Sequence, residues 1–141
     1  MLEYSLSDLT GKVAVIIGAS GQHNFGVAIA RRMAKADARV VVSARRQEPI
    51  TALAAEIGGV AIACDISSED QLKNLFGQVE EQMGRVDIAV NCAGQQSAAP
   101  ISMFGGRFGH KATKLPVKTV RRIYELSGVL VFQCMTSASG Q

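Results

Sequence analysis

Short apolar runs alternate with amphipathic stretches through the first two thirds of the chain. The apolar runs are VAVII (13–17), RVVVS (39–43), VAIAC (60–64) and VDIAVN (86–91). Apolar residues at helical spacing fall between them, near residues 25–36, 48–57 and 69–83. This alternation is typical of parallel strands that lie between two layers of helices. The pattern therefore predicts an α/β fold with a doubly wound parallel sheet.

Capping and turn residues mark the ends of these elements. Ser68 and Gln71 have the spacing of a capping box, and Gly84 follows the last apolar position of that helix. Gly58 is placed to end the preceding helix in the same way. Asp37 stands where the first helix should end, and we expect a left-handed turn there because aspartate tolerates that conformation.

The alternation of apolar runs and amphipathic stretches weakens after residue 94. Residues 95–119 show no sustained period and are expected to form a long irregular loop. A helical pattern resumes over 120–136, interrupted by Gly128. We expect one domain, with a core over 1–94 and a partial helix over 120–141.

Composition excludes several classes of protein. Of the 141 residues, 48% are hydrophobic and 19% charged, which argues for a compact domain and against disorder. A net charge of +3 gives no indication of nucleic-acid binding. Cys64, Cys92 and Cys134 form no Cys-x-x-Cys pair and are interpreted as reduced thiols. We expect a cytoplasmic protein, because no apolar segment reaches membrane length and no secretory leader is evident.

The segment VAVIIGASGQHNFGVAIA (13–30) carries the clearest chemistry. A strand runs into a loop containing Gly18, Gly21 and Gly26, and an Ala-rich helix follows. A helix N-terminus presents unpaired N–H groups and partial positive charge, and glycines allow the backbone to approach a diphosphate. The alternative for Gly18 and Gly26 is tight strand–helix packing without a ligand. His23 is expected to be an exposed loop residue.

Four motifs follow one another along the chain: LTGKVAVIIGAS (9–20), VVVSARR (40–46), CDIS (64–67) and NCAG (91–94). In this order they resemble the short-chain dehydrogenase/reductase family. The resemblance implies a Rossmann-type NAD(P)-binding domain with spatial strand order third, second, first, fourth, and hydride-transfer chemistry. The loop departs from most of the family: Ile17 replaces a threonine and the loop is two residues longer. Its length is similar to that of the divergent enoyl-acyl-carrier-protein reductase branch, with Asn24 where serine is frequent.

The end of the second strand bears on the choice of cofactor. A carboxylate there binds the ribose 2′-hydroxyl of NAD, but this chain has Ala44, followed by Arg45 and Arg46. A guanidinium can pair bidentately with a 2′-phosphate, so NADP is favoured over NAD. The alternative is two arginines that are simply solvated at a strand end.

The resemblance also implies roles near the third and fourth strands. Asp65, with the main chain of Ile66, is similar to the family aspartate that contacts adenine; the alternative is a role in capping the following helix. Asn91, Ala93 and Gly94 match a motif that lies against the adenosine ribose, and Cys92 within it is expected to be inert. The candidate cofactor-binding residues are thus Gly18, Ser20, Gly21, Asn24, Phe25, Gly26, Arg45, Arg46, Asp65, Ile66, Asn91, Ala93 and Gly94.

The family's catalytic pair is not found. No Tyr-x-x-x-Lys occurs, and neither Tyr4 nor Tyr124 has the lysine partner. Glu125 stands where many relatives have a catalytic asparagine, and Ser137 and Ser139 align with no catalytic serine. No catalytic or metal-binding residue is therefore assigned.

Three functions stay open at this point. The chain could be part of an NADP-dependent oxidoreductase, a non-catalytic NADP-binding or assembly module, or a fragment without useful cofactor affinity. We expect the sheet to stop after the fourth strand and the following helix. The unpaired edge left there would favour a homo-oligomer.

Overall fold

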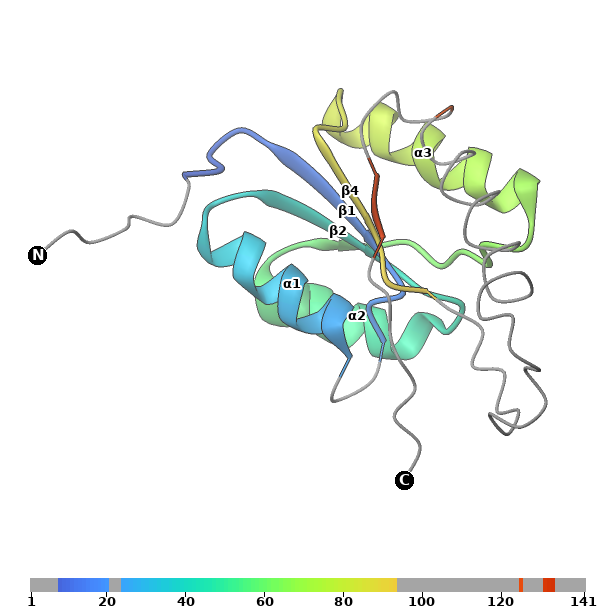
Figure 1. Ribbon diagram of the computed structural model, residues 1–141, viewed down its shortest axis with the longest axis horizontal. Coiled ribbons are helices and arrows are strands. Elements are labelled where there is room, and N and C mark those ends of the chain that lie inside the picture. The colour runs from blue at the N-terminus through green and yellow to red at the C-terminus, as the bar shows by residue number, and fades with distance from the viewer. Residues whose placement is uncertain (1–7, 21–23, 94–124, 126–130, 134–141) are drawn as a thin grey trace, which may run out of the picture.

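The fold is a parallel sheet between two layers of helices (Figure 1). The computed structural model describes residues 8–20, 24–93, 125 and 131–133. In chain order the elements are β1 (Val13–Ile17), α1 (Phe25–Lys35), β2 (Arg39–Ser43), α2 (Gln47–Ile57), β3 (Val60–Ala61), α3 (Glu69–Met83), β4 (Ile88–Asn91) and β5 (Val131–Gln133). The sheet order is β3-β2-β1-β4-β5, and every pairing is parallel.

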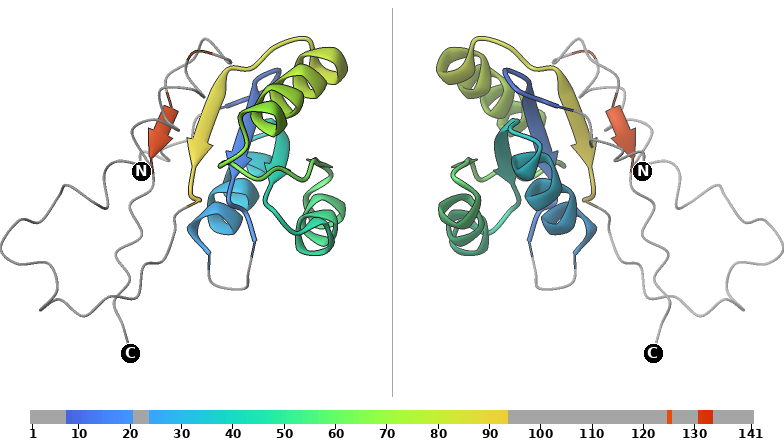
Figure 2. Two further views of the ribbon diagram at one scale, coloured as in Figure 1. Left: turned by 90° about the vertical axis from the view of Figure 1, so that its right-hand side faces the viewer. Right: turned by 90° about the vertical axis from the view of Figure 1, so that its left-hand side faces the viewer.

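The predicted order of the first four strands is confirmed, but the sheet does not stop at the fourth. β5 pairs with β4 in register from Ala89 with Val131 to Asn91 with Gln133, and Figure 2 shows the two arrows side by side and pointing the same way. The expected helix over 120–136 is thus wrong at 131–133, although Glu125 is helical. The reason is that β4 offers a row of backbone hydrogen-bonding groups to this short apolar run. The irregular loop expected over 95–119 lies outside the described residues.

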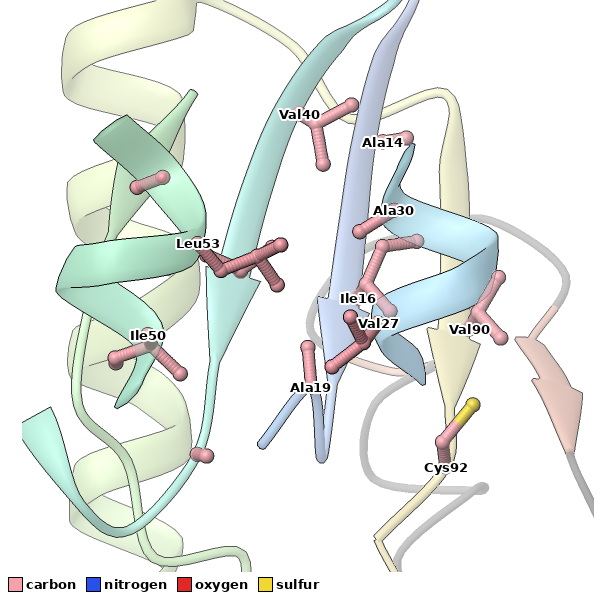
Figure 3. Packing of buried hydrophobic residues seen from close by; sticks show 13 residues of the cluster. Ala14, Ile16, Ala19, Val27, Ala30, Val40, Ile50, Leu53, Val90 and Cys92 are labelled. Atoms are coloured by element: carbon pink, nitrogen blue, oxygen red, sulfur yellow. The ribbon is translucent and has the colours of Figure 1, made fainter. Parts of the chain in front are cut away.

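Successive side chains of each strand point to opposite faces of the sheet, and this divides the core into two clusters. Ala14 and Ile16 of β1 face α1 and α2, whereas Val13, Val15 and Ile17 face α3. Figure 3 shows the first cluster, where side chains from α1 and α2 point at the sheet. All five residues of β1 are buried, as expected for a central strand covered on both faces.

Most of the predicted turn residues are confirmed. Gly58 and Gly84 end α2 and α3 in left-handed conformations, and Asp37 has φ 65°. Ser68 caps α3 by accepting from the N–H of Gln71 at 3.3 Å. The capping box is only half formed, however, because the Gln71 side chain accepts instead from the Asp65 N–H at 2.8 Å.

The second and third strands stay paired beyond the end of β3. β3 itself covers two of the five predicted positions. Past it, Ile62 N–H donates to Val42 O at 3.1 Å and Cys64 N–H donates to Ala44 O at 3.0 Å. These hydrogen bonds bring the chain after β2 and the chain after β3 to the same edge of the sheet.

Candidate nucleotide-binding site

The predicted site residues that the structure describes lie at or just beyond the carboxyl ends of the strands. Gly18 and Ala19 both donate their N–H to the carbonyl oxygen of Ser43, at 2.7 and 3.1 Å, which ties the β1–α1 loop to the end of β2. Cys92 N–H donates to Ile17 O at 2.7 Å, which ties the chain after β4 to the end of β1, where this loop begins. Ligands of open α/β sheets bind at this edge.

Gly18 is required by close backbone packing. It has φ +85°, and a Cβ at this position would lie 2.4 Å from Ala93 N and 2.7 Å from the carbonyl carbon of Cys92. Gly26 is also tightly placed, since a Cβ there would lie 2.9 Å from Gly18 O. Both glycines are therefore needed for tight packing between strand and helix. This packing is compatible with a phosphate site, because it also shapes the loop.

The N-terminus of α1 has the electrostatic character of an anion site. Asn24 caps the helix and its Oδ1 accepts from Gly26 N at 2.6 Å. The first turn of α1 contains no acidic residue, whereas α2 has Glu48 and α3 has Glu69 and Asp70 in theirs. The positive end of α1 thus lacks the carboxylate that compensates the other two helices.

Phe25 begins α1 and stands out at the surface of this end. It is 60% exposed and is the large hydrophobic residue most open to solvent among the described positions. Ser20, just before the undescribed part of the loop, is half-buried. Gly21, His23 and Gly94 lie outside the described residues.

Arg45 and Arg46 leave the end of β2 as exposed cations. Neither guanidinium takes part in a hydrogen bond or ion pair among residues 8–20 and 24–93. Arg46 occupies the N-cap position of α2 without a side-chain capping bond. The residue directly after β2 is the buried Ala44, so no carboxylate stands at that position.

Asp65 forms a turn ahead of α3 rather than its cap. Its Oδ1 accepts from Ser67 N at 2.9 Å and from Ser67 Oγ at 2.7 Å. The capping role considered for Asp65 belongs to Ser68. The Ser67 hydroxyl and N–H hold the pKa of the Asp65 carboxyl below its usual value, and the charge of Arg45 adds to this effect. Ile66, the next residue, is half-buried against the α3-facing cluster.

Asn91 and Cys92 end β4 inside the protein. Asn91 is 1% exposed, and its Oδ1 accepts from Ala93 N at 3.1 Å, which fixes the chain beside Gly18. Cys92 and Cys64 are buried thiols without a disulfide. Burial, with a smaller contribution from Asp65, raises the pKa of the Cys64 thiol to about 11, so this thiol stays protonated at neutral pH. Cys134 lies outside the described residues.

Ser43 was not predicted as a site residue. Its carbonyl oxygen holds the β1–α1 loop, and its Oγ is buried without a hydrogen-bond partner in the described part of the chain. The only signal in the sequence is a polar residue at the end of an otherwise apolar run, which does not distinguish a buried hydroxyl from an exposed one.

This combination of a parallel sheet, a tight glycine loop and an uncompensated helix N-terminus defines a dinucleotide-binding α/β protein of the Rossmann type. Residues 12–139 match the short chain dehydrogenase family. The chain therefore belongs to the short-chain dehydrogenase/reductase family, whose members bind nicotinamide dinucleotides.

Individual relatives agree with this assignment. The chain is 38% identical over 85 residues to a 3-oxoacyl-[acyl-carrier-protein] reductase of Bos taurus, covering 59% of this chain and 35% of the relative. It is 42% identical over 90 residues to a farnesol dehydrogenase of Aedes aegypti, covering 60% and 36%. A metagenomic short-chain oxidoreductase solved in complex with NADP superposes with a TM-score of 0.71 at 28% identity, covering 96% of this chain and 66% of that one.

The chain thus spans about a third of the length of these curated relatives. Within the described part, no helix is both long and apolar enough to cross a membrane.

Proposed function

We propose that this chain is the cofactor-binding part of a short-chain oxidoreductase that uses NADP in preference to NAD. The main supporting observation is the pair of exposed arginines at the end of β2. They form no hydrogen bond or ion pair among the described residues, and they lie at the sheet edge that also holds the N-terminus of α1. The family membership supports nicotinamide dinucleotide binding in general, and Arg45 and Arg46 support the narrower choice.

The donor groups of the site fit the chemistry of such a cofactor. The N-terminus of α1 would hold the diphosphate, and Arg45 and Arg46 would hold the 2′-phosphate. Asp65 Oδ2 takes part in no hydrogen bond among the described residues, so it could accept from the adenine amino group. Ile66, Asn91 and Ala93 would line the adenosine side.

A bound nicotinamide would exchange a hydride with a carbonyl or alcohol carbon of a small molecule. The residues of this chain would fix the position of the nucleotide and exclude water from its buried side. Proton exchange with the substrate oxygen requires a group that we do not assign within the 141 residues, because no Tyr-x-x-x-Lys pair is present.

The cofactor preference is tested by titrating the chain with NADPH and NADH in a calorimeter. Replacing both Arg45 and Arg46 with Ala should weaken NADPH binding by roughly tenfold to 150-fold, because a charged hydrogen bond contributes about 1.5–3 kcal/mol. NADH binding should change little. Arg39→Ala is the matched control, since Arg39 is an exposed arginine at the other end of β2. Equal losses for the two nucleotides would reject the preference.

A non-catalytic nucleotide-binding module is the second candidate, favoured by the missing Tyr-x-x-x-Lys pair. The two candidates differ in turnover. Tight NADPH binding without oxidation of NADPH by a panel of aldehydes, ketones and activated alkenes would favour the module, whereas carbonyl-dependent oxidation would favour the enzyme.

Self-association is part of the proposal as well. In the described sheet β3 and β5 are the edge strands. Exposed sheet edges favour pairing with a further chain. Sedimentation velocity should show a species larger than a monomer, and a monomer that persists at all concentrations would contradict this.

A further inference from the structure

Arg45 and Asp65 leave neighbouring strands at the same edge of the sheet. Cys64 N–H donates to Ala44 O at 3.0 Å, so the two chains are still paired one residue before these side chains. Paired strands lie about 4.8 Å apart. The basic residue proposed to hold the 2′-phosphate therefore has a carboxylate on the adjacent chain.

The Asp65 carboxylate is fixed rather than mobile. Ser67 donates to its Oδ1 through both the N–H and the hydroxyl, at 2.9 and 2.7 Å. Gln71 Oε1 accepts from the Asp65 N–H at 2.8 Å and holds the backbone as well. These hydrogen bonds orient the carboxylate in the chain after β3.

Arg45 and Asp65 are near each other without being bonded. Neither residue belongs to an ion pair within the described ranges. The charge of Arg45 nevertheless reaches Asp65, since it contributes to the lowered pKa of that carboxyl. An anion held by Arg45 would lie within similar reach of the Asp65 charge.

We propose that Asp65 is a specificity-determining residue whose fixed carboxylate, beside Arg45 at the sheet edge, opposes the 2′-phosphate and so moderates the preference for NADP over NAD. This inference rests on the proposed cofactor function. It differs from an adenine contact, because adenine is common to both nucleotides, whereas a charge acting on the 2′-phosphate changes only their ratio.

The test compares dissociation constants of NADPH and NADH for the unmodified chain and for Asp65→Asn, at low and high salt. Asp65→Asn should raise the NADPH-to-NADH affinity ratio by about threefold to tenfold, which is the order of the Coulomb repulsion between two nearby like charges in a largely aqueous medium. The increase should shrink at high salt. The matched control is Glu81→Gln, which removes an exposed carboxylate near the far end of α3 and should leave the ratio unchanged.

The outcomes separate the two proposals. If the unmodified chain binds neither nucleotide, the proposed function fails and this inference fails with it. If the chain binds them and Asp65→Asn changes both affinities by the same factor, or neither, the specificity role is overturned while the cofactor site stands. A ratio that rises equally in Glu81→Gln would indicate a general charge effect and would also overturn the role.

Discussion

Replacing Gly18 with Ala should destabilise the protein more than any other single glycine-to-alanine change at a described turn. Two costs add at this position. The φ of +85° disfavours a side chain by about 1–2 kcal/mol. The new Cβ would also lie 2.4 Å from Ala93 N, a backbone atom that cannot rotate away, and overpacking of this kind costs about 1–3 kcal/mol.

Two other glycines serve as comparisons, one with the positive φ alone and one with neither cost. Gly84 has φ +79°, and a Cβ added there would meet nothing within 4 Å, so Gly84→Ala should lose only about 1–2 kcal/mol of unfolding free energy. Gly77 lies inside α3 with open space around it, so Gly77→Ala should gain about 0.5–1 kcal/mol. Gly18→Ala should lose about 2–5 kcal/mol, the sum of its two costs.

Urea unfolding followed by circular dichroism measures all three variants against the unmodified chain. The expected loss for Gly18→Ala is a large part of the roughly 5–15 kcal/mol by which domains are stable. A Gly18→Ala variant that loses no more than Gly84→Ala would refute the reasoning, because it would show that the contact between the β1–α1 loop and the end of β4 is not tight.

Two further predictions concern buried polar groups. Ser43→Ala should raise the free energy of unfolding by about 1 kcal/mol, because it removes a buried hydroxyl that has no partner in the described part of the chain. Ser68→Ala should lower the free energy of unfolding by about 1 kcal/mol, because the α3 cap is lost. A loss of stability in both variants would contradict the prediction for Ser43. Asp87 is partly desolvated, yet the Val13 N–H and Arg85 hold the pKa of its carboxyl below the usual value. The ionised Asp87 carboxylate should therefore stabilise the fold above about pH 4, and this stabilisation should be lost as the pH falls further. The difference in unfolding free energy between the unmodified chain and Asp87→Asn should accordingly decrease on acid titration. A difference that stays constant from about pH 7 to about pH 2.5 would contradict this prediction.

Local signals in the sequence predicted the elements and their ends well. Apolar runs located four strands, and Asp37, Gly58 and Gly84 adopt the left-handed turns expected of them. These features depend on neighbours in the chain, which a sequence displays directly. The half-formed capping box shows the limit: Gln71 has the right spacing, but its side chain bonds to Asp65, six residues away.

Features that depend on distant residues were missed. β5 is three residues long, and its conformation depends on pairing with β4, about forty positions earlier in the chain. The burial of Ser43 Oγ and the contact of Gly18 with Ala93 likewise arise only when separate segments meet. For the candidate site, the motifs nominate residues, whereas the adjacency of Arg45 and Asp65 follows only from the paired strands.

Main-chain atoms anchor the described part of the β1–α1 loop to β2, since the N–H groups of Gly18 and Ala19 share one carbonyl oxygen of Ser43. The exposed side chains at positions 45 and 46 can therefore be exchanged without disturbing that anchor. In the proposed function, the choice between NADP and NAD is therefore separable from diphosphate binding, and a few substitutions after β2 would change that choice during evolution or in the laboratory.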